Sequence, residues 1–216
     1  IMRLVQMAGV VPGDRAQMAF GYGMFTGGFG LHYGLQKLGC MMIPAGSGNT
    51  ERHIAMIEDY GTTVLVATPS YALHMCEVGE QMGFDWKAST LRVGLFGGEP
   101  CPPGLKAEIE GRMHIVCTDN YGLTEVMGPG VSGECLASRD MQHIAEDHFL
   151  WEVVDPDTGE PVPDGEEGEL ALTPLGKQAI PVLRYRTHDL TRVTCEPCAC
   201  GRTHARMRKV RSRSDD

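Results

Sequence analysis

Residues 62–70 read Thr-Thr-Val-Leu-Val-Ala-Thr-Pro-Ser, and this short stretch decides the class of fold. The run over 62–68 is short, apolar and rich in β-branched residues, which predicts a buried β-strand. Pro69-Ser70 follows at once, and proline is favoured in the first turn of a helix, so the next helix is predicted over 71–82. A strand that passes directly into a helix is the repeating unit of an α/β protein.

The same alternation continues on both sides of this stretch. Upstream, a helix is predicted over 50–60, with Asn49 as its N-cap and Gly61 at its end. Downstream, a strand over 91–96 is followed by a helix that starts at Pro102-Pro103 and that Gly111 closes. A helix within 21–39 and a strand over 40–43 complete this part. We therefore expect a mostly parallel sheet flanked by helices, with ligands at the carboxyl ends of its strands.

The pattern changes after Gly130. Residues 151–155 and 168–172 alternate apolar and polar side chains, and turn clusters lie between them. This part is predicted to be antiparallel, as a distorted β-barrel-like subdomain. We therefore expect an α/β subdomain over 1–130 and a β-rich subdomain over 131–216.

Composition limits the ligands and the compartment. The chain has 216 residues, 42% of them hydrophobic, and a formal net charge of −9, which argues against nucleic acid as the main ligand. The segment 202–213 contains six basic residues. It could be an arm that binds nucleic acid or a strand with one solvated basic face. No apolar run approaches the ~20 residues of a membrane span. Eight cysteines indicate a reducing compartment, and the absence of a signal peptide makes the cytoplasm the expected location.

Two segments carry polar groups that suit a nucleotide. Residues 119–125 read Asp-Asn-Tyr-Gly-Leu-Thr-Glu and follow a strand-like run. Residues 184–190 read Arg-Tyr-Arg-Thr-His-Asp-Leu and lie at the end of the strand-like stretch 180–185. Together they offer an aromatic face for a base, a hydroxyl for a phosphate, Glu125 for a metal and Asp189 for ribose hydroxyls.

Each of these residues also has a simpler interpretation. Thr124 could be a helix N-cap with Glu125 in the first turn, beside a tyrosine of the core. Asp189 could pair on the surface with one of the nearby arginines, which are Arg184, Arg186 and Arg192.

The two motifs resemble those of the adenylate-forming enzymes, the acyl-CoA synthetase superfamily. The stretch Gly-Leu-Thr-Glu-Val-Met-Gly-Pro-Gly-Val at 122–131 and Arg-Ser-Asp-Asp at 213–216 are similar to the phenylacetate-CoA ligase family. The resemblance implies that ATP with Mg²⁺ activates an aryl-acetic acid to an acyl-adenylate, which is transferred to coenzyme A. It covers the middle of such an enzyme, because the phosphate loop that normally precedes this region is not found and the small C-terminal domain normally follows residue 216. We expect this fragment alone to be inactive.

The resemblance also assigns roles. Thr124 would bind the α-phosphate and Glu125 the Mg²⁺ ion. The expected nucleotide-binding residues are Gly98, Glu99, Pro100, Asp119, Tyr121, Gly122, Asp189 and Arg213. The expected acyl pocket is lined by Tyr22, Phe25, Gly97 and Gly122, and Asp215 is the expected hinge to the next domain. By pattern alone, residues 97–100 could be only a turn and the aromatics at 22–25 only close helix packing. His188 and Ser212 stand where the family usually has glycine.

Cysteines near the end of the chain indicate a metal site. Cys195, Cys198 and Cys200 lie within six residues, and Cys135 and His143 lie upstream. A Cys-x-Cys segment with a remote Cys and His supplies the four ligands of a closed tetrahedral zinc site. The family implies Cys135, His143, Cys198 and Cys200 as ligands, with Cys195 as a substitute for one of them. The alternative is that these are buried or incidental thiols.

The resemblance thus implies an acid-thiol ligase, with ATP, an aryl carboxylic acid and coenzyme A as partners and with structural Zn²⁺. We expect neither nucleic acid nor a membrane as a partner, and homodimerisation stays open. Two alternatives remain: an adenylate-forming enzyme with an acceptor other than CoA, and a non-catalytic, zinc-stabilised nucleotide-binding module.

Overall fold

A computed structural model describes residues 1–215, and these divide into a first unit, Ile1–Asp119, and a second unit that begins at Asn120. Asp216, the last residue of the Arg-Ser-Asp-Asp motif, lies outside the described residues. The division falls within strand β5 (Val116–Leu123), ahead of the boundary expected at residue 130. The sequence composition changes only after the turn between β5 and β6. The strand pairing changes earlier, because β5 pairs in parallel with β4 through its first half and antiparallel with β6 through its second half.

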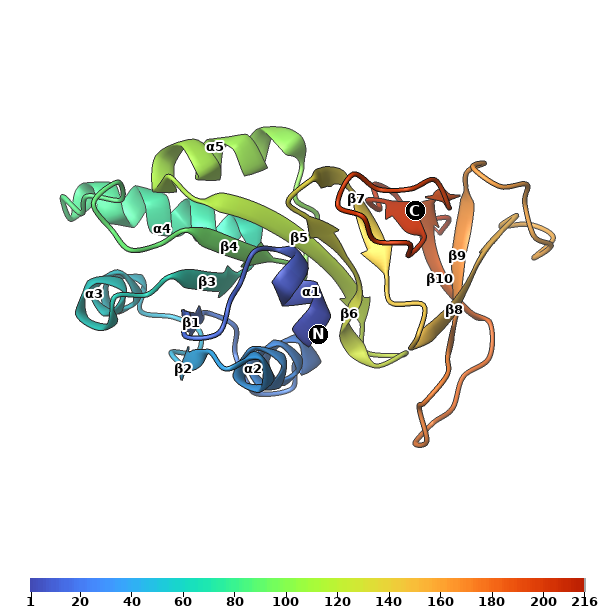
Figure 1. The fold of residues 1–216 in the computed structure, drawn as a ribbon, viewed down its shortest axis with the longest axis horizontal. Helices are drawn as coiled ribbons and strands as arrows, with labels where there is room; N and C mark the ends of the chain where they lie inside the picture. Colours follow the sequence, from blue (N-terminus) through green and yellow to red (C-terminus); the bar gives the residue numbers. More distant parts are fainter. Residues whose placement is uncertain (216) are drawn as a thin grey trace. The chain divides into compact units, whose positions relative to one another are not determined.

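The first unit contains a parallel sheet in the order β5-β4-β3-β1-β2 (Figure 1). Its other strands are β1 (Arg15–Met18), β2 (Met41–Ile43), β3 (Val64–Ala67) and β4 (Val93–Phe96). Every residue of β3 and β4 is buried, which explains their continuous apolar sequences. The predicted parallel sheet is confirmed, although β1 was not predicted.

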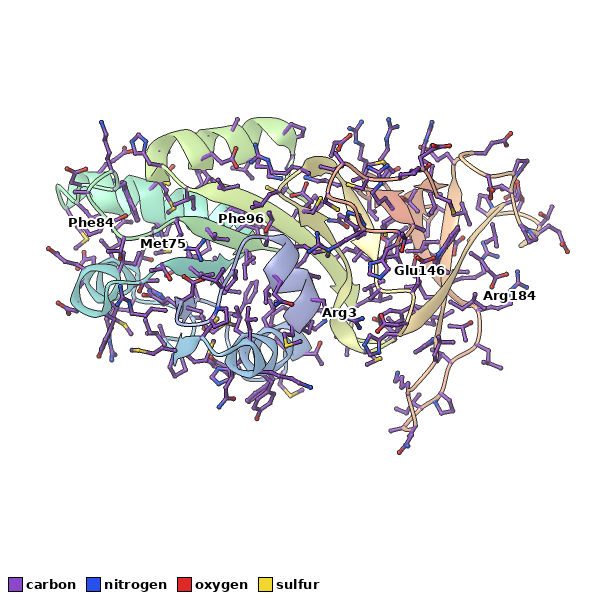
Figure 2. All side chains as sticks on the ribbon, in the orientation of Figure 1. Arg3, Met75, Phe84, Phe96, Glu146 and Arg184 are labelled. Carbon is purple, nitrogen blue, oxygen red and sulfur yellow. The ribbon has the colours of Figure 1, made fainter. Side chains whose placement is uncertain are left out.

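Five helices flank this sheet. They are α1 (Met2–Met7), α2 (Thr26–Leu38), α3 (Thr50–Tyr60), α4 (Pro69–Gln81) and α5 (Pro103–Met113). Helices α4 and α5 lie on one face of the sheet, and α1 and α2 lie on the other (Figure 1). Helices α3, α4 and α5 share one hydrophobic core, which includes Met75 and Phe96 (Figure 2). Burial of such large side chains stabilises the unit, and truncating Phe96 to alanine would cost about 3–5 kcal/mol.

Local capping explains where the helices begin and end. The Asn49 side chain accepts a hydrogen bond from the Arg52 amide at 3.1 Å, as predicted for the N-cap of α3. Thr68 Oγ1 likewise accepts from the Tyr71 amide at 3.2 Å at the start of α4. The predicted end of α5 at Gly111 was wrong. The helix continues to the buried Met113, and it ends where His114 adopts a left-handed conformation with φ 58°.

The second unit is antiparallel, as predicted, and contains two groups of paired strands. One joins the second half of β5 to β6, β7, β12 and β11, and the other has the order β10-β9-β8. The strands are β6 (Gly128–Cys135), β7 (Ser138–Ile144), β8 (Phe149–Val154), β9 (Gly168–Pro174), β10 (Tyr185–Thr191), β11 (Val193–Thr194) and β12 (Arg206–Arg208). Both groups contribute to one core, with Val131 and Ile144 from one and Leu170 and Leu172 from the other.

Two segments differ from the expectation. The motif at 119–125 was expected to follow a strand, but β5 itself continues to Leu123, so the motif is mostly strand and the turn covers 124–127. Strand β10 begins at Tyr185, where the predicted strand 180–185 was to end. The reason is that Ile180 and Arg184 have positive φ angles of 50° and 48°, which interrupt an extended strand.

The described residues hold no helix that combines the length and the hydrophobicity of a transmembrane segment. The basic tail contains the short strand β12, in which Met207 is fully buried between the more exposed Arg206 and Arg208. The simpler interpretation of this tail, a strand with one solvated face, therefore accounts for its pattern.

Candidate functional site

In the first unit, the predicted acyl-pocket segments follow the carboxyl ends of β1 and β4, which lie on either side of β3. Strand β1 leads into the segment that contains Tyr22 and Phe25, and β4 leads into Gly97 and Gly98. A Cβ atom placed on Gly98 would lie 3.8 Å from Cζ of Phe25 and 3.8 Å from Cγ2 of Thr68, which follows β3. The strand order reverses at β1, and such a switch point is where open α/β sheets bind ligands.

The aromatic side chains rest on glycines of α2. A Cβ atom on Gly27 would lie 2.4 Å from the Phe25 ring, so a larger residue there would require this ring to move. The Tyr22 hydroxyl lies 2.9 Å from Nδ1 of His32, and burial raises the pKa of Tyr22, so this phenol stays neutral near pH 7. Close packing on the helix therefore occurs, and it leaves Phe25 exposed.

Glu99 has a partner that the sequence did not indicate. Its Oε1 accepts a hydrogen bond from the Ser70 amide at 2.6 Å. Ser70 lies in the first turn of α4, where amide groups lack partners within the helix and carboxylates are favourable. Glu99 therefore caps α4, while Gly97 is buried and Pro100 is exposed.

In the second unit, the two predicted nucleotide motifs are brought together. The Tyr121 hydroxyl donates a hydrogen bond of 2.5 Å to Oδ2 of Asp189, although 68 residues separate them. Arg213 lies opposite Asp189 in an isolated β-bridge, with 3.9 Å between Nη1 and Oδ1. Arg213 also contacts Asp215 through Nε and Nη2 at 2.8 and 3.2 Å. A tyrosine, an acidic acceptor and an arginine thus form one polar cluster.

The simpler interpretation of Asp189, a surface pair with a nearby arginine of its own strand region, does not describe the structure. The three arginines considered as partners, Arg184, Arg186 and Arg192, each form an ion pair with a glutamate at 3.6 Å or less. The partners are Glu152 for Arg184, Glu169 for Arg186 and Glu167 for Arg192. Asp189 is instead held by Tyr121 and Arg213, from segments distant in sequence.

Burial and hydrogen bonding set the charge of this cluster. Burial raises the pKa of Asp189, while the Tyr121 hydroxyl and the Arg213 guanidinium oppose that rise. Burial and the Asp189 carboxylate raise the pKa of Tyr121, so the phenol keeps its proton and remains a donor.

Thr124 and Glu125 lie in the exposed turn between β5 and β6. Lys177, in the segment between β9 and β10, donates a hydrogen bond from Nζ to the backbone carbonyl of Glu125. Lys177 was not predicted, because nothing in its sequence neighbourhood shows which turn it meets.

Gly122 and Asp119 both lie in β5. A Cβ atom on Gly122 would lie 2.3 Å from the Gly128 carbonyl oxygen, so the turn between β5 and β6 requires glycine there. Asp119 is buried and lies opposite Phe96 in the parallel register of β5 and β4.

The four predicted metal ligands converge in the second unit. The ligand atoms of Cys135, His143, Cys198 and Cys200 all lie within 4.8 Å of one another. The sulfurs of Cys135 and Cys198 are 3.8 Å apart, and Nε2 of His143 is 3.4 Å from the Cys200 sulfur. A tetrahedral zinc ion with ordinary bond lengths requires separations of about 3.8 Å between sulfurs and about 3.6 Å between sulfur and nitrogen. The side chains therefore fit zinc.

Different elements supply these ligands. Cys135 ends β6 and His143 lies in β7, whereas Cys198 and Cys200 lie between β11 and β12. A tight turn holds the last pair, because the amide of Gly201, at φ 78°, donates to the Cys198 carbonyl at 2.9 Å. Burial and nearby basic groups lower the pKa of His143, which favours the neutral imidazole that binds metals. Cys195 is exposed and is not part of this group.

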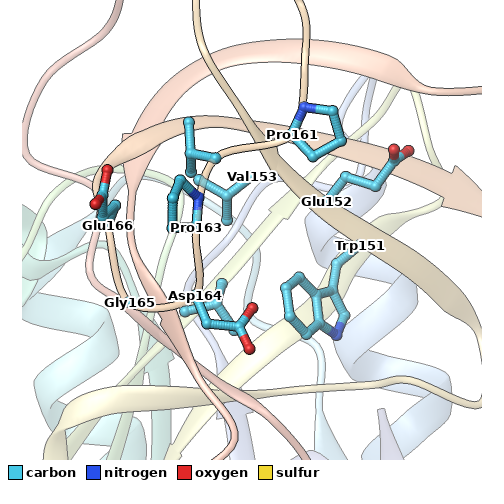
Figure 3. A pocket seen from close by; sticks show the side chains of 10 residues that line it. Trp151, Glu152, Val153, Pro161, Pro163, Asp164, Gly165 and Glu166 are labelled. Carbon is cyan, nitrogen blue, oxygen red and sulfur yellow. The ribbon is translucent and has the colours of Figure 1, made fainter.

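A separate pocket lies in the second unit, beside β8 (Figure 3). It is lined by Trp151, Glu152, Val153, Pro161, Val162, Pro163, Asp164, Gly165, Glu166 and Val193. The indole of Trp151 donates to Oε1 of Glu146 at 3.0 Å. None of the predicted nucleotide or metal residues lines this pocket, so it takes no part in those sites.

Comparison with known proteins identifies the family. Residues 5–174 match the family described as AMP-binding enzyme. Over its whole length the chain is 48% identical to the phenylacetate-coenzyme A ligase of Aromatoleum evansii and 47% identical to that of Escherichia coli (strain K12), covering 48% and 49% of those proteins. The chain thus spans about half the length of the curated relatives it matches.

A solved structure shows the same fold. The chain superimposes with a TM-score of 0.94 and 28% identity on 2-hydroxyisobutyryl-CoA ligase in complex with 2-HIB-AMP and CoA, and it covers 100% of its own length and 46% of that chain. Taken with the match over residues 5–174, this places the chain in the AMP-binding enzyme family.

Proposed function

We propose that the complete gene product activates an aryl-acetic acid, such as phenylacetate, with ATP and transfers the acyl group to coenzyme A. The observation that carries the proposal is the pairing of Tyr121 with Asp189 beside Arg213, which joins the two nucleotide motifs in one cluster. The 44–48% identity to four phenylacetate-coenzyme A ligases supports the substrate class.

ATP would be bound mainly through groups of the second unit. The Tyr121 ring would stack on adenine, Asp189 would accept hydrogen bonds from the ribose hydroxyls, and Arg213 would contact ribose or phosphate. Thr124 would bind the α-phosphate. Glu125 would hold Mg²⁺, which neutralises charge on the phosphates when bound. The exposure of Thr124 and Glu125 leaves both able to meet a ligand.

The acyl group would lie at the strand ends of the first unit. Phe25 packs near Gly98 there, and Tyr22 is held by His32, which suits a flat apolar ring. Gly97, Gly98 and Pro100 would present backbone to the substrate, with Glu99 fixing their turn through α4. Asp215, held by Arg213, would be the hinge for rotation toward the second reaction.

The proposed chemistry has two displacements. A carboxylate oxygen of the acid attacks the α-phosphorus of ATP, and the bond to pyrophosphate breaks, giving the acyl-adenylate. The thiolate of CoA then attacks the acyl carbonyl carbon, and AMP leaves. The side chains named above position the reactants and balance charge, and none of them acts as a nucleophile.

We also propose that Cys135, His143, Cys198 and Cys200 bind a structural zinc ion. Two of their separations are close to those of a tetrahedral site, all four ligand atoms lie within 4.8 Å of one another, and four protein ligands leave no open position for substrate. The ion would tie the β6–β7 hairpin to the segment before β12, which adds to folding free energy. A reducing cytoplasm, in keeping with eight free cysteines, stays a prediction.

The test is pyrophosphate release by the complete gene product with ATP and a panel of aryl acids, followed by detection of the CoA thioester. Release that depends on phenylacetate, with thioester formation, is expected. Pyrophosphate without thioester would indicate another acceptor, and nucleotide binding without pyrophosphate would indicate a binding module.

A further inference from the structure

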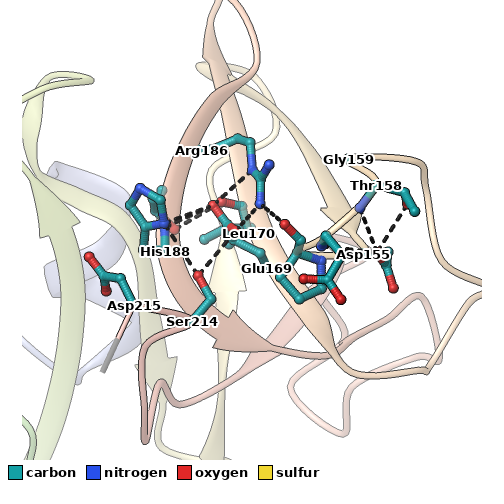
Figure 4. A network of polar contacts seen from close by, with 12 residues as sticks. Asp155, Thr158, Gly159, Glu169, Leu170, Arg186, His188, Ser214 and Asp215 are labelled. Atoms are coloured by element: carbon teal, nitrogen blue, oxygen red, sulfur yellow. Dashed lines mark hydrogen bonds and ion pairs between the residues drawn. The ribbon is translucent and has the colours of Figure 1, made fainter.

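Glu169, a buried carboxylate outside the two nucleotide motifs, lies at the centre of a polar network (Figure 4). Its side chain is 0% exposed. Arg186 donates to both of its oxygens, from Nε at 3.1 Å and Nη2 at 2.5 Å. The His188 amide donates to Oε1 at 3.0 Å, and the Ser214 hydroxyl donates to Oε2 at 3.2 Å. One carboxylate therefore gathers donors from two separate segments.

The first segment is the part of β10 that carries Asp189. Pairing with β9 is irregular between Arg186 and Leu190, so this part bulges away from a regular ladder. His188, inside the bulge, has a positive φ of 63°. Besides the contacts to Glu169, Thr187 Oγ1 donates to the Leu170 carbonyl at 2.9 Å and accepts from the Asp189 amide at 3.1 Å. The bulge therefore fixes the direction in which the Asp189 side chain points from β10.

The second segment is 212–214, which carries Arg213. It is held to the bulge by two backbone hydrogen bonds: the Leu190 amide donates to the Ser212 carbonyl at 3.0 Å, and the Ser214 amide donates to the His188 carbonyl at 2.7 Å. The imidazole of His188 also lies 3.3 Å from the Ser214 hydroxyl (Figure 4).

The carboxylate of Glu169 is charged in this setting. Burial opposes its ionisation, but the hydrogen bonds from Arg186, His188 and Ser214 hold its pKa below the ordinary value. A buried carboxylate that loses such donors is strongly disfavoured, because it has no water to replace them. The β10 bulge and the 212–214 segment are therefore both hydrogen-bonded to the same carboxylate, that of Glu169.

We infer that Glu169 is a positioning residue, which aligns Asp189 and Arg213 for the ribose of ATP by holding the bulge and the 212–214 segment together. The role rests on the proposed nucleotide function of those two residues. Glu169 itself does not touch the ligand. It acts through the His188 amide and the Ser214 hydroxyl.

The test compares three variants of the complete gene product: Glu169→Gln, Ser214→Ala and the control Ser212→Ala. Ser212 is exposed and contacts the bulge through its backbone carbonyl, which alanine keeps. The first readout is the preference for ATP over 2′-deoxy-ATP, as a ratio of kcat/KM in pyrophosphate release. The second is hydrogen exchange of the Leu190 and Ser214 amides, which needs no activity.

We expect the preference for ATP to fall about tenfold in Glu169→Gln and about threefold in Ser214→Ala, with no change in the control. Exchange at both amides should become faster in the first two variants only. If Glu169→Gln fails to fold, Ser214→Ala still decides. An unchanged preference and unchanged exchange in Ser214→Ala would overturn the inference. If the wild-type protein releases no pyrophosphate, the proposed function fails, and the exchange rates alone decide whether Glu169 holds the segments together.

Discussion

Replacing Tyr121 with phenylalanine isolates the contact that joins the two nucleotide motifs. The ring stays, so stacking on a base is retained, but the 2.5 Å hydrogen bond to Asp189 is lost. Removing a hydrogen bond to a charged group costs about 1.5–3 kcal/mol. Tyr121 is partly exposed, so water replaces some of the contact, and we expect the lower end, about 1.5 kcal/mol of stability.

The substitution should also change how ATP binding depends on pH. Burial already raises the pKa of Asp189, and the Tyr121 hydroxyl opposes this by stabilising the charged form. Without the hydroxyl, the pKa of Asp189 rises further, so the carboxylate becomes protonated at a higher pH as the solution is acidified. A protonated acid is a poorer acceptor for ribose hydroxyls. The KM for ATP in Tyr121→Phe should therefore begin to rise at a higher pH than in wild type.

The assay is pyrophosphate release as a function of ATP concentration from pH 8 down to the acid limit of stability, with Tyr185→Phe as the matched control. Tyr185 lies in the same unit, and replacing it leaves the Tyr121 hydroxyl in place. Superimposable pH profiles of KM for wild type and Tyr121→Phe would refute the reasoning. So would an equal shift in Tyr185→Phe, because the effect would then not belong to the hydrogen bond.

Four other outcomes are expected. Glu125→Gln should slow pyrophosphate release far more than it weakens nucleotide binding, and unchanged release at saturating Mg²⁺ would contradict the metal role. Asp189→Ala should abolish the preference for ATP over 2′-deoxy-ATP while zinc content stays the same; a preference equal to wild type would show that Asp189 does not meet the 2′-hydroxyl. Elemental analysis should find about one zinc per chain in wild type and in Cys195→Ser, and none in Cys198→Ser. Zinc retained in Cys198→Ser would reject the proposed set of ligands. Gly122→Ala should cost about 1–3 kcal/mol in chemical denaturation, because its Cβ would collide with the carbonyl oxygen across the turn; wild-type stability would show that the turn can move.

The sequence predicted those parts of the fold that depend on local chemistry. The cap at Asn49 and the buried run of β3 are set by residues close together in the chain, so periodicity and capping rules locate them. The convergence of Cys135, His143, Cys198 and Cys200 was expected for a different reason: a Cys-x-Cys segment with a remote Cys and His suits zinc, and the resemblance to the family implied this set of residues.

The errors arose where distant pairing overrides the local pattern. Strand β5 extends to Leu123 because β6 pairs with its second half, and no signal within 119–125 announces that partner. Strand β10 begins at Tyr185 because positive φ angles at Ile180 and Arg184 interrupt the extended chain before it. Helix α5 continues past Gly111 because the buried Met113 adds contacts that outweigh the low helix propensity of glycine.

Glu169 could not be assigned from the sequence for a similar reason. Its neighbours Gly168 and Leu170 indicate only a strand, and an isolated glutamate there is expected to face solvent. Its burial becomes understandable only once the register of β9 and β10 places Arg186 beside it and the 212–214 segment returns to the same place.

The cap on α4 determines which groups can balance phosphate charge. A helix that begins at the carboxyl edge of a parallel sheet commonly offers its amino-terminal amides to an anionic ligand. In this chain Glu99 already occupies the Ser70 amide, so the positive end of α4 is neutralised by a protein carboxylate. An incoming triphosphate would meet repulsion there rather than attraction. Under the proposed function, the phosphate charge would therefore be balanced by cations such as Arg213 and Mg²⁺, and binding of ATP should weaken as salt is added.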